Sequence, residues 1–88
     1  MKRNENYLMH EVAGKTMIVP VGDACREFNG LLTVNETGKF LWEQLAAETT
    51  EEKLLEAILA EYDVAAEIAR NDIAAFLEAL RKAKALQE

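Results

Sequence analysis

The spacing of apolar residues changes near Asn35, and this change limits the possible fold more than any other feature of the sequence. Before Asn35, Tyr7–Val12 alternates loosely between apolar and polar residues. Met17–Val21 is rich in β-branched residues and lies between glycines, and both patterns are typical of strands. After Asn35, apolar residues recur at the three- and four-residue spacing of amphipathic helices. The sequence therefore predicts an α+β fold in which the strands precede the helices.

The strand region contains clear turn signals. Ala13-Gly14-Lys15 separates the first two strands and predicts a hairpin turn. Pro20 has no backbone N–H to donate, so the second strand should end there or leave one side free. A polar loop is expected over Gly22–Gly30, followed by a short third strand over Leu31–Val34.

Helices are predicted for the rest of the chain, and three can be separated by their start and stop signals. Asn35 should cap the first helix. Thr49 with Glu52 forms a capping-box pattern, which predicts the start of the second. The third is expected to begin after the break at Asp63-Val64 and to run to about Leu86. The apolar stripe of the second helix comprises Leu54, Leu55, Ile58, Leu59 and Tyr62.

The predicted third helix has two apolar faces. Its core face comprises Ile73, Phe76, Leu77 and Leu80. A second stripe on one flank comprises Ile68, Ala75, Ala79 and Leu86, with Ala83 close by. Small side chains leave room for another backbone to approach, which would make this flank the wall of a groove. The high helix propensity of alanine explains the same stripe without a groove, and the residues leave both readings open.

The length of 88 residues is enough for one small domain with one modest core. No apolar stretch approaches the length of a membrane span, and the basic start leads into no signal-peptide core. Cys25 is the only cysteine, which excludes an internal disulfide and agrees with a reducing compartment. A cytoplasmic protein without membrane contact is therefore expected.

The negative charge of the chain is concentrated in its middle. The formal net charge is −6, and residues 36–63 carry eight acidic side chains against Lys39 and Lys53. Binding to a phosphate backbone depends on clustered lysine and arginine, so this segment would repel nucleic acid. No nucleic-acid partner is expected.

Several catalytic and metal-binding motifs are begun but not completed. Residues 13–16 end like a phosphate-binding loop, but Met9 stands where that motif needs glycine. His10-Glu11 begins like a zinc-protease helix, but Gly14 occupies the place of the second histidine. One histidine and one cysteine cannot form a strong zinc site, and Cys25 has no histidine in obvious partnership. Neither catalysis nor a cofactor is predicted.

Three strings, in this order along the chain, resemble the PqqD-like family. Residues 32–38, Leu-Thr-Val-Asn-Glu-Thr-Gly, followed by Phe-Leu-Trp-Glu-Gln-Leu at 40–45, resemble its strand-to-helix signature. Residues 50–62 are similar to its second helix, which closes here with the Tyr-x-Val step of residues 62–64. Residues 72–80 resemble the third-helix pattern Asp-(Val/Ile)-x-x-Phe-Leu-x-x-Leu.

The resemblance implies one domain over residues 1–88, with an ordered core at about 7–86. The implied fold is winged helix-turn-helix-like, with a three-stranded antiparallel sheet followed by three helices. The implied function is that of a non-catalytic recognition element for ribosomally synthesised, post-translationally modified peptides. Such a domain binds the leader segment of a precursor peptide and presents it to a modifying enzyme, often a radical S-adenosylmethionine enzyme, and needs no cofactor of its own.

The resemblance also implies where the leader binds, because in this family it adds as a strand to the third strand and lies against the third helix. The strand pairing would come from Leu31, Leu32, Thr33 and Val34. The groove wall would come from Ile68, Asp72, Ala75, Phe76 and Ala79. A short strand with a free edge suits this mode, known as β-augmentation.

Other uses of that strand edge remain open. The loop at 22–30 would cover it in one alternative, and a second copy of the chain would pair with it as a homodimer in another. If the edge does bind a peptide, proline at Leu32 or Thr33 should weaken binding. The effect is expected only at the position whose N–H points outward, and the sequence does not say which position that is.

Two other functions compete with peptide recognition. A winged-helix DNA-binding protein would place residues 65–72 against the bases, but this segment contains two acidic residues and one arginine. A docking or regulatory subunit without peptide contact would use the acidic face of the first two helices against a basic partner. The same acidic residues would also simply keep a small domain soluble.

Overall fold

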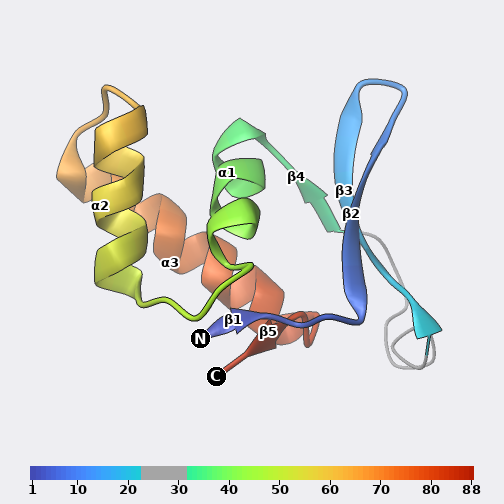
Figure 1. Ribbon diagram of the computed structural model, residues 1–88. Coiled ribbons are helices and arrows are strands. Elements are labelled where there is room, and N and C mark those ends of the chain that lie inside the picture. Colours follow the sequence, from blue (N-terminus) through green and yellow to red (C-terminus); the bar gives the residue numbers. More distant parts are fainter. Residues whose placement is uncertain (23–31) are drawn as a thin grey trace.

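The computed structural model describes residues 1–22 and 32–88. Its elements, in chain order, are β1 (Lys2–Arg3), β2 (Tyr7–Val12), β3 (Lys15–Pro20), β4 (Leu32–Val34), α1 (Glu36–Gln44), α2 (Glu51–Glu61), α3 (Ala66–Lys82) and β5 (Leu86–Gln87). Strands β2, β3 and β4 form an antiparallel sheet in that order, while β1 and β5 form a separate pair. The predicted α+β order of a three-stranded sheet followed by three helices is confirmed (Figure 1).

Part of the predicted sheet region lies outside the described residues. Residues 23–31 include most of the predicted polar loop, together with Cys25 and Leu31. Strand β2 spans Tyr7–Val12 and β3 ends at Pro20, as predicted, but β3 begins at Lys15, two residues before the predicted start at Met17. Strand β1 was not predicted from the sequence.

The β2–β3 hairpin turns through two residues. Val12 pairs with Lys15, which leaves Ala13 and Gly14 as the turn, with φ angles of +52° and +79°. Two positive φ angles characterise the type I′ turn, whose twist matches that of the strands it joins. The three-residue turn predicted from the sequence was therefore one residue too long, because Lys15 already belongs to the ladder.

The core lies between the helices and the inner face of the sheet. The largest fully buried side chains are Trp42, Ile18, Leu41, Leu45, Leu54, Ile58, Ile73, Leu77 and Leu80. Two members of the stripe predicted for α2 are not among the buried residues, because Leu59 and Tyr62 are 40% and 37% exposed. Tyr7 joins the sheet to the end of α3, where its hydroxyl donates to the Ala83 carbonyl oxygen at 2.6 Å.

The helix starts follow the rules of N-capping, with one correction. Asn35 caps α1 as predicted, since its side-chain oxygen accepts the Gly38 N–H at 2.8 Å. The cap of α2 is Thr50, which accepts the Lys53 N–H at 3.2 Å, so the capping box predicted from Thr49 was wrong by one residue. The backbone N–H and carbonyl of Thr49 are instead bonded to the N-terminal residue. Because Thr49 is held by this long-range contact, the adjacent Thr50 serves as the N-cap of α2.

Helix α3 ends four residues earlier than predicted. Lys84 has a φ of +61°, and hydrogen bonds run from Ala85 N–H to the Leu80 carbonyl and from Lys84 N–H to the Arg81 carbonyl. These bonds form a Schellman motif. Glycine usually occupies the left-handed position of this motif, so a lysine there hides the helix end from sequence analysis. The following residues form β5, which the sequence did not predict.

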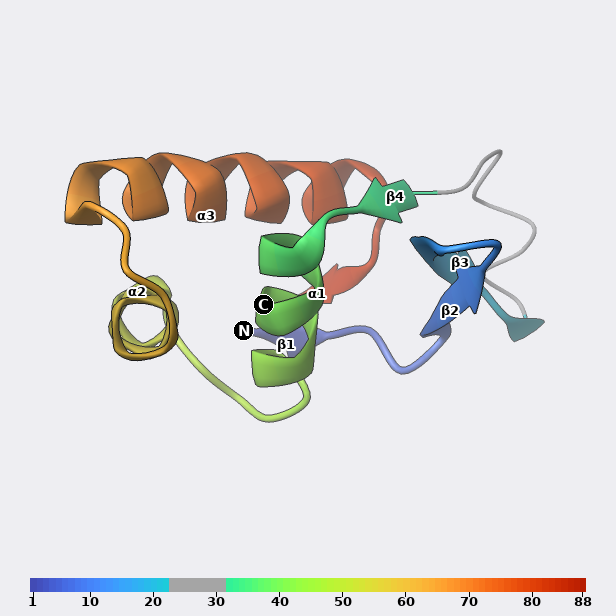
Figure 2. The same ribbon diagram turned by 90° about the horizontal axis from the view of Figure 1, so that it is seen from above.

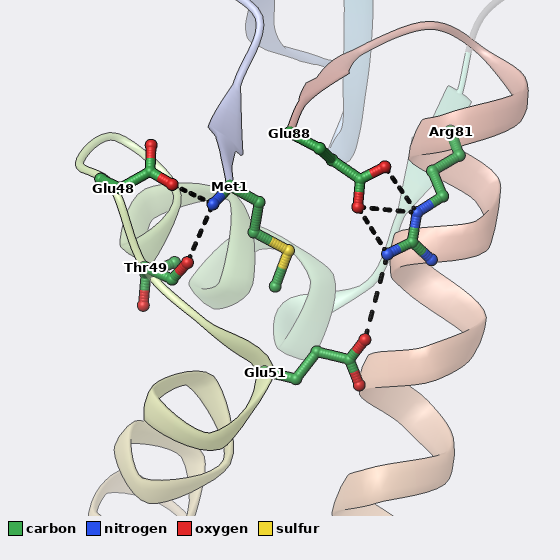
Figure 3. A network of polar contacts seen from close by, with 6 residues as sticks. All are labelled: Met1, Glu48, Thr49, Glu51, Arg81 and Glu88. Atoms are coloured by element: carbon green, nitrogen blue, oxygen red, sulfur yellow. Dashed lines mark hydrogen bonds and ion pairs between the residues drawn. The ribbon is translucent and has the colours of Figure 1, made fainter.

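The two chain ends are held against the helices (Figure 3). The N-terminal ammonium of Met1 contacts the Glu48 carboxylate and donates to the Thr49 carbonyl at 3.0 Å. Arg81 on α3 donates to the Glu88 carboxylate at 2.8 Å. Strands β1 and β5, one from each end of the chain, therefore pair on one side of the helices (Figure 1).

The carboxyl group of Glu88 is expected to titrate below an ordinary glutamate. Hydrogen bonds from Arg81 lower the pKa of Glu88 because they favour its charged form. A lowered pKa in the folded state means that the pair stabilises the fold above the unfolded pKa, and that this contribution is lost as pH falls through the folded pKa. Carbon-detected NMR of the glutamate carboxyls against pH measures this directly. Arg81→Gln should return Glu88 to the ordinary range, and an ordinary titration in the unaltered protein would contradict the pairing.

Within residues 1–22 and 32–88, no helix combines the length and apolar character needed to cross a membrane.

Candidate functional site

A groove runs between strand β4 and helix α3, with the start of α1 beneath it. Its volume is about 270 Å³. In Figure 2, β4 lies near the C-terminal end of α3. The groove is lined by Leu32, Thr33, Val34, Asn35, Thr37, Gly38, Leu41, Asp72, Ala75, Phe76 and Ala79.

Most of the residues expected to bind a peptide are brought together here. The groove collects Leu32, Thr33, Val34, Asp72, Ala75, Phe76 and Ala79 from that set. Ile68 is 54% exposed and does not line the groove, because it lies one helical turn before Asp72. Leu31 lies outside the described residues.

Strand β4 forms one edge of its sheet. In the order β2-β3-β4, it pairs with β3 on one side, and no strand of the described residues pairs with its other side. Its register places Thr16 opposite Val34, Met17 opposite Thr33, and Ile18 opposite Leu32. An unpaired edge of this kind presents backbone N–H and carbonyl groups to an incoming strand.

The register determines which backbone groups of β3 face which neighbour. In an antiparallel sheet, the N–H and carbonyl of one residue point to the same side, and successive residues alternate. Val21 donates its N–H to the Asn6 carbonyl at 2.8 Å, one step beyond the pairing of Tyr7 with Pro20. By this alternation, the odd-numbered residues of β3 face β2 and its even-numbered residues face β4.

The same alternation identifies the outward-facing residue of β4. Thr16 and Ile18 face β4, so their partners Val34 and Leu32 direct their backbone groups back toward β3. Thr33 is opposite Met17, which faces β2, and its N–H and carbonyl therefore point to the free edge. Of the two positions that the sequence left undecided for a proline test, Thr33 is the one exposed to an incoming strand.

Gly38 allows α1, β4 and α3 to meet at the floor of the groove. A Cβ atom at this position would lie 3.1 Å from Val34 Cβ and 3.2 Å from Phe76 Cε1. Both distances are tighter than ordinary van der Waals contact, so only glycine fits without displacing a neighbour. A glycine inside a helix lowers stability by about 1 kcal/mol relative to alanine. A glycine within a predicted helix is therefore a sequence signal that another element packs closely against the helix at that position.

Phe76 has an intermediate position. The sequence placed it on the core face of the third helix, but it is only partly buried, packs against the core cluster and also lines the groove. Ala75 is exposed and Ala79 is partly buried. Because both side chains are small, they leave space beside α3 along the groove. Two members of the flank stripe, Ala75 and Ala79, therefore line the groove, whereas Ile68, Ala83 and Leu86 do not.

The groove is chemically simple. Asp72 is its only titratable lining residue, and it forms no ion pair within the described part of the chain. No group of three or more metal-ligating side chains occurs among residues 1–22 and 32–88. Apolar side chains beside an open strand edge suit the binding of an extended peptide.

The family follows from a comparison of the whole chain with known protein families. The model of the family described as coenzyme PQQ synthesis protein D (PqqD) matches residues 8–86. The chain belongs to the PqqD family. No curated protein sequence matches this PqqD-family chain.

Two solved structures share the fold of this PqqD-family chain. The structure described as TbiB1 in complex with the TbiA(beta) leader peptide is 21% identical, covers 99% of this chain and 95% of its own, and has a TM-score of 0.75. Lasso peptide synthetase B1 complexed with the leader peptide is 16% identical, covers 92% of this chain and 89% of its own, and has a TM-score of 0.69. These values confirm the expected fold of a three-stranded antiparallel sheet followed by three helices.

Proposed function

We propose that this PqqD-family chain binds the leader segment of a ribosomally synthesised precursor peptide and presents it to a modifying enzyme. The observation that carries the proposal is the groove between the open edge of β4 and the face of α3 that carries Ala75 and Ala79. The leader peptides in both similar solved structures support it. The chain itself performs no chemistry in this proposal and works in the cytoplasm beside its enzyme.

The leader adds to the sheet as a strand next to β4. Thr33 donates its N–H and accepts with its carbonyl, and alternate leader side chains enter the groove over Phe76. The small side chains of Ala75 and Ala79 give the leader backbone room beside α3. Backbone pairing supplies affinity, and the apolar groove supplies selectivity.

The modifying enzyme gains from this binding through local concentration. A bound leader keeps the attached core peptide near the active site, which raises its effective concentration to the millimolar range when the connection is short. Moderate affinity is then sufficient, and the product leaves readily. The enzyme class that we propose as partner is a radical S-adenosylmethionine enzyme.

The proposal is tested by a heteronuclear NMR titration with the leader of the precursor peptide encoded nearest to this chain. We expect chemical-shift changes in residues 32–35 and 72–79, and none on the solvent-exposed face of α2. A docking subunit without peptide contact would respond to the enzyme and not to the leader. The absence of shifts at millimolar peptide would reject that peptide as the ligand.

A homodimer through the free edge of β4 would use the same backbone groups of Thr33 as the leader. The two uses therefore exclude each other, and leader addition should dissociate any dimer. Sedimentation equilibrium with and without the leader distinguishes them. A dimer that persists at saturating leader would show that the edge belongs to the second copy.

Filling the groove should block leader binding without harming the fold. Ala75 is exposed and lines the groove, so Ala75→Leu places a larger side chain in the space of the leader backbone. We expect at least a tenfold loss of affinity by isothermal titration, equivalent to about 1.4 kcal/mol. The adjacent Ala74 is also exposed but lines a different pocket, beside α2, so Ala74→Leu is the matched control. Equal effects of the two substitutions would argue against the groove.

A further inference from the structure

A second pocket adjoins the groove at the end away from the β2–β3 hairpin. It has a volume of about 260 Å³ and lies where the starts of α1 and α3 meet the end of α2. The end of α2 and the start of α1 lie at the top of Figure 1. The pocket is lined by Thr37, Ile58, Tyr62, Asp63, Val64, Ala69 and Asp72.

Thr37 and Asp72 line both the groove and this pocket, so the two hollows adjoin at these residues. Strand β4 runs toward Thr37, and Asn35 between them keeps an extended backbone with φ −89° and ψ −175°. A peptide strand that pairs with β4 and continues past its C-terminal end therefore reaches the second pocket.

The lining of the pocket separates into an apolar floor and an acidic rim. Ile58 and Ala69 are 2% and 1% exposed, and Val64 is half-buried. Asp63 and Asp72 are exposed, and neither forms an ion pair within the described part of the chain. No lysine, arginine or histidine of residues 1–22 and 32–88 lines the pocket. A side chain with an apolar stem and a cationic head matches both parts.

Helix dipoles do not reverse this preference. The starts of α1 and α3 each contribute roughly half a positive charge, and the end of α2 contributes roughly half a negative charge. Asn35 already uses one N–H group at the start of α1. Two full carboxylate charges therefore outweigh the remaining positive partial charge.

We propose that this pocket is a specificity subsite for a lysine or arginine of the bound leader, located beyond the residues that pair with β4. The proposal rests on leader binding by the groove. The aliphatic stem of the side chain lies along Ile58 and Val64, and its charged head reaches the rim carboxylates, as long basic side chains do at such boundaries. The subsite sets the register of the leader, because strand pairing alone does not distinguish positions separated by two residues.

The test uses a displayed library of random 16-residue peptides. The library is selected on the unaltered protein after peptides that bind Thr33→Pro have been removed, so that the retained peptides depend on the strand edge. We expect lysine or arginine to recur at one fixed distance from an apolar segment. The same selection on Asp63→Asn should weaken this preference, because Asp63 lines the second pocket and not the groove.

Affinities then measure the contact itself. Replacing the basic residue of a selected peptide by methionine should weaken binding about fivefold, the magnitude of a favourable exposed charge pair. With Asp63→Asn this difference should shrink to about twofold or less. Glu56→Gln removes the same charge from an exposed position on α2 that does not line the pocket, and should leave the fivefold difference unchanged.

The outcomes separate this subsite from leader binding in general. The selected peptides depend on the edge of β4. If they show no recurrent lysine or arginine, or an apolar residue at that position, either result would overturn the cationic subsite and leave the groove proposal intact. An equal loss for Asp63→Asn and Glu56→Gln would show a general charge effect and would also overturn the subsite. A library without any edge-dependent peptide would reject the groove and the subsite together.

Discussion

Replacing Thr33 with proline is expected to reduce leader affinity at least tenfold while the protein remains folded. The substitution removes the one N–H of β4 that points to the free edge, and it leaves a carbonyl of the leader without its partner. The proline ring also occupies space on the side that the leader must approach. Proline is tolerated on an edge strand when its missing N–H would have faced solvent, so the sheet itself should persist. Isothermal titration gives the affinity, and circular dichroism checks the fold.

Neighbouring positions provide the controls for this prediction. Thr33→Val keeps the backbone N–H and a β-branched side chain, so it should bind the leader like the unaltered protein. Leu32→Pro and Val34→Pro remove hydrogen bonds that face β3, so they should lower stability instead of acting on the leader alone. Strand addition would be wrong for this chain if Thr33→Pro bound the leader with unchanged affinity.

Trp42→Ala should cause the largest loss of stability, about 3–5 kcal/mol. The Trp42 side chain is 1% exposed and is among the largest fully buried side chains of the described core. A small domain has little stability in reserve, so the variant should be partly unfolded at room temperature. Urea unfolding followed by circular dichroism measures the change.

Arg3 allows the packing of Trp42 to be separated from its polar contacts. The Arg3 guanidinium lies 5.5 Å from the centre of the Trp42 ring, and its Nη1 donates to the Trp42 carbonyl at 3.1 Å. Arg3→Met removes both contacts and keeps an apolar stem, so we expect a loss of about 1 kcal/mol. A larger loss for Arg3→Met than for Trp42→Ala would mean that the N-terminal strand, and not the core, limits stability.

The proposed function requires only a moderate affinity of the groove for the leader, and the residues that line the groove agree with this. In the proposed function, one short strand edge and a few small or apolar side chains would be enough to hold a leader whose core peptide reacts elsewhere. The acidic second pocket would add selection of register to this general binding. Recognition of the leader and chemistry on the core peptide can then reside in separate proteins.

Most of the local structure could be predicted from sequence patterns. The alternation of Tyr7–Val12, the stop at Pro20 and the cap at Asn35 all appear at the predicted positions. Seven of the nine residues expected to bind the leader line one groove. These nine residues were chosen mainly from the resemblance to the PqqD-like family. The exceptions are Ile68, which lies a turn away, and Leu31, which lies outside the described residues.

The amino-acid sequence by itself determined the three strands of the main sheet, the three helices and their order, because periodicity, turn residues and caps act within a few residues of one another. Only the tertiary structure decided what depends on contacts between distant residues. It selected Thr50 over Thr49 as a cap, ended α3 at Lys82 with Lys84 in the left-handed region just beyond it, and paired β1 with β5. It also turned the backbone of Thr33 outward, because the pairing of β3 with β2 fixes the direction of every group on β4.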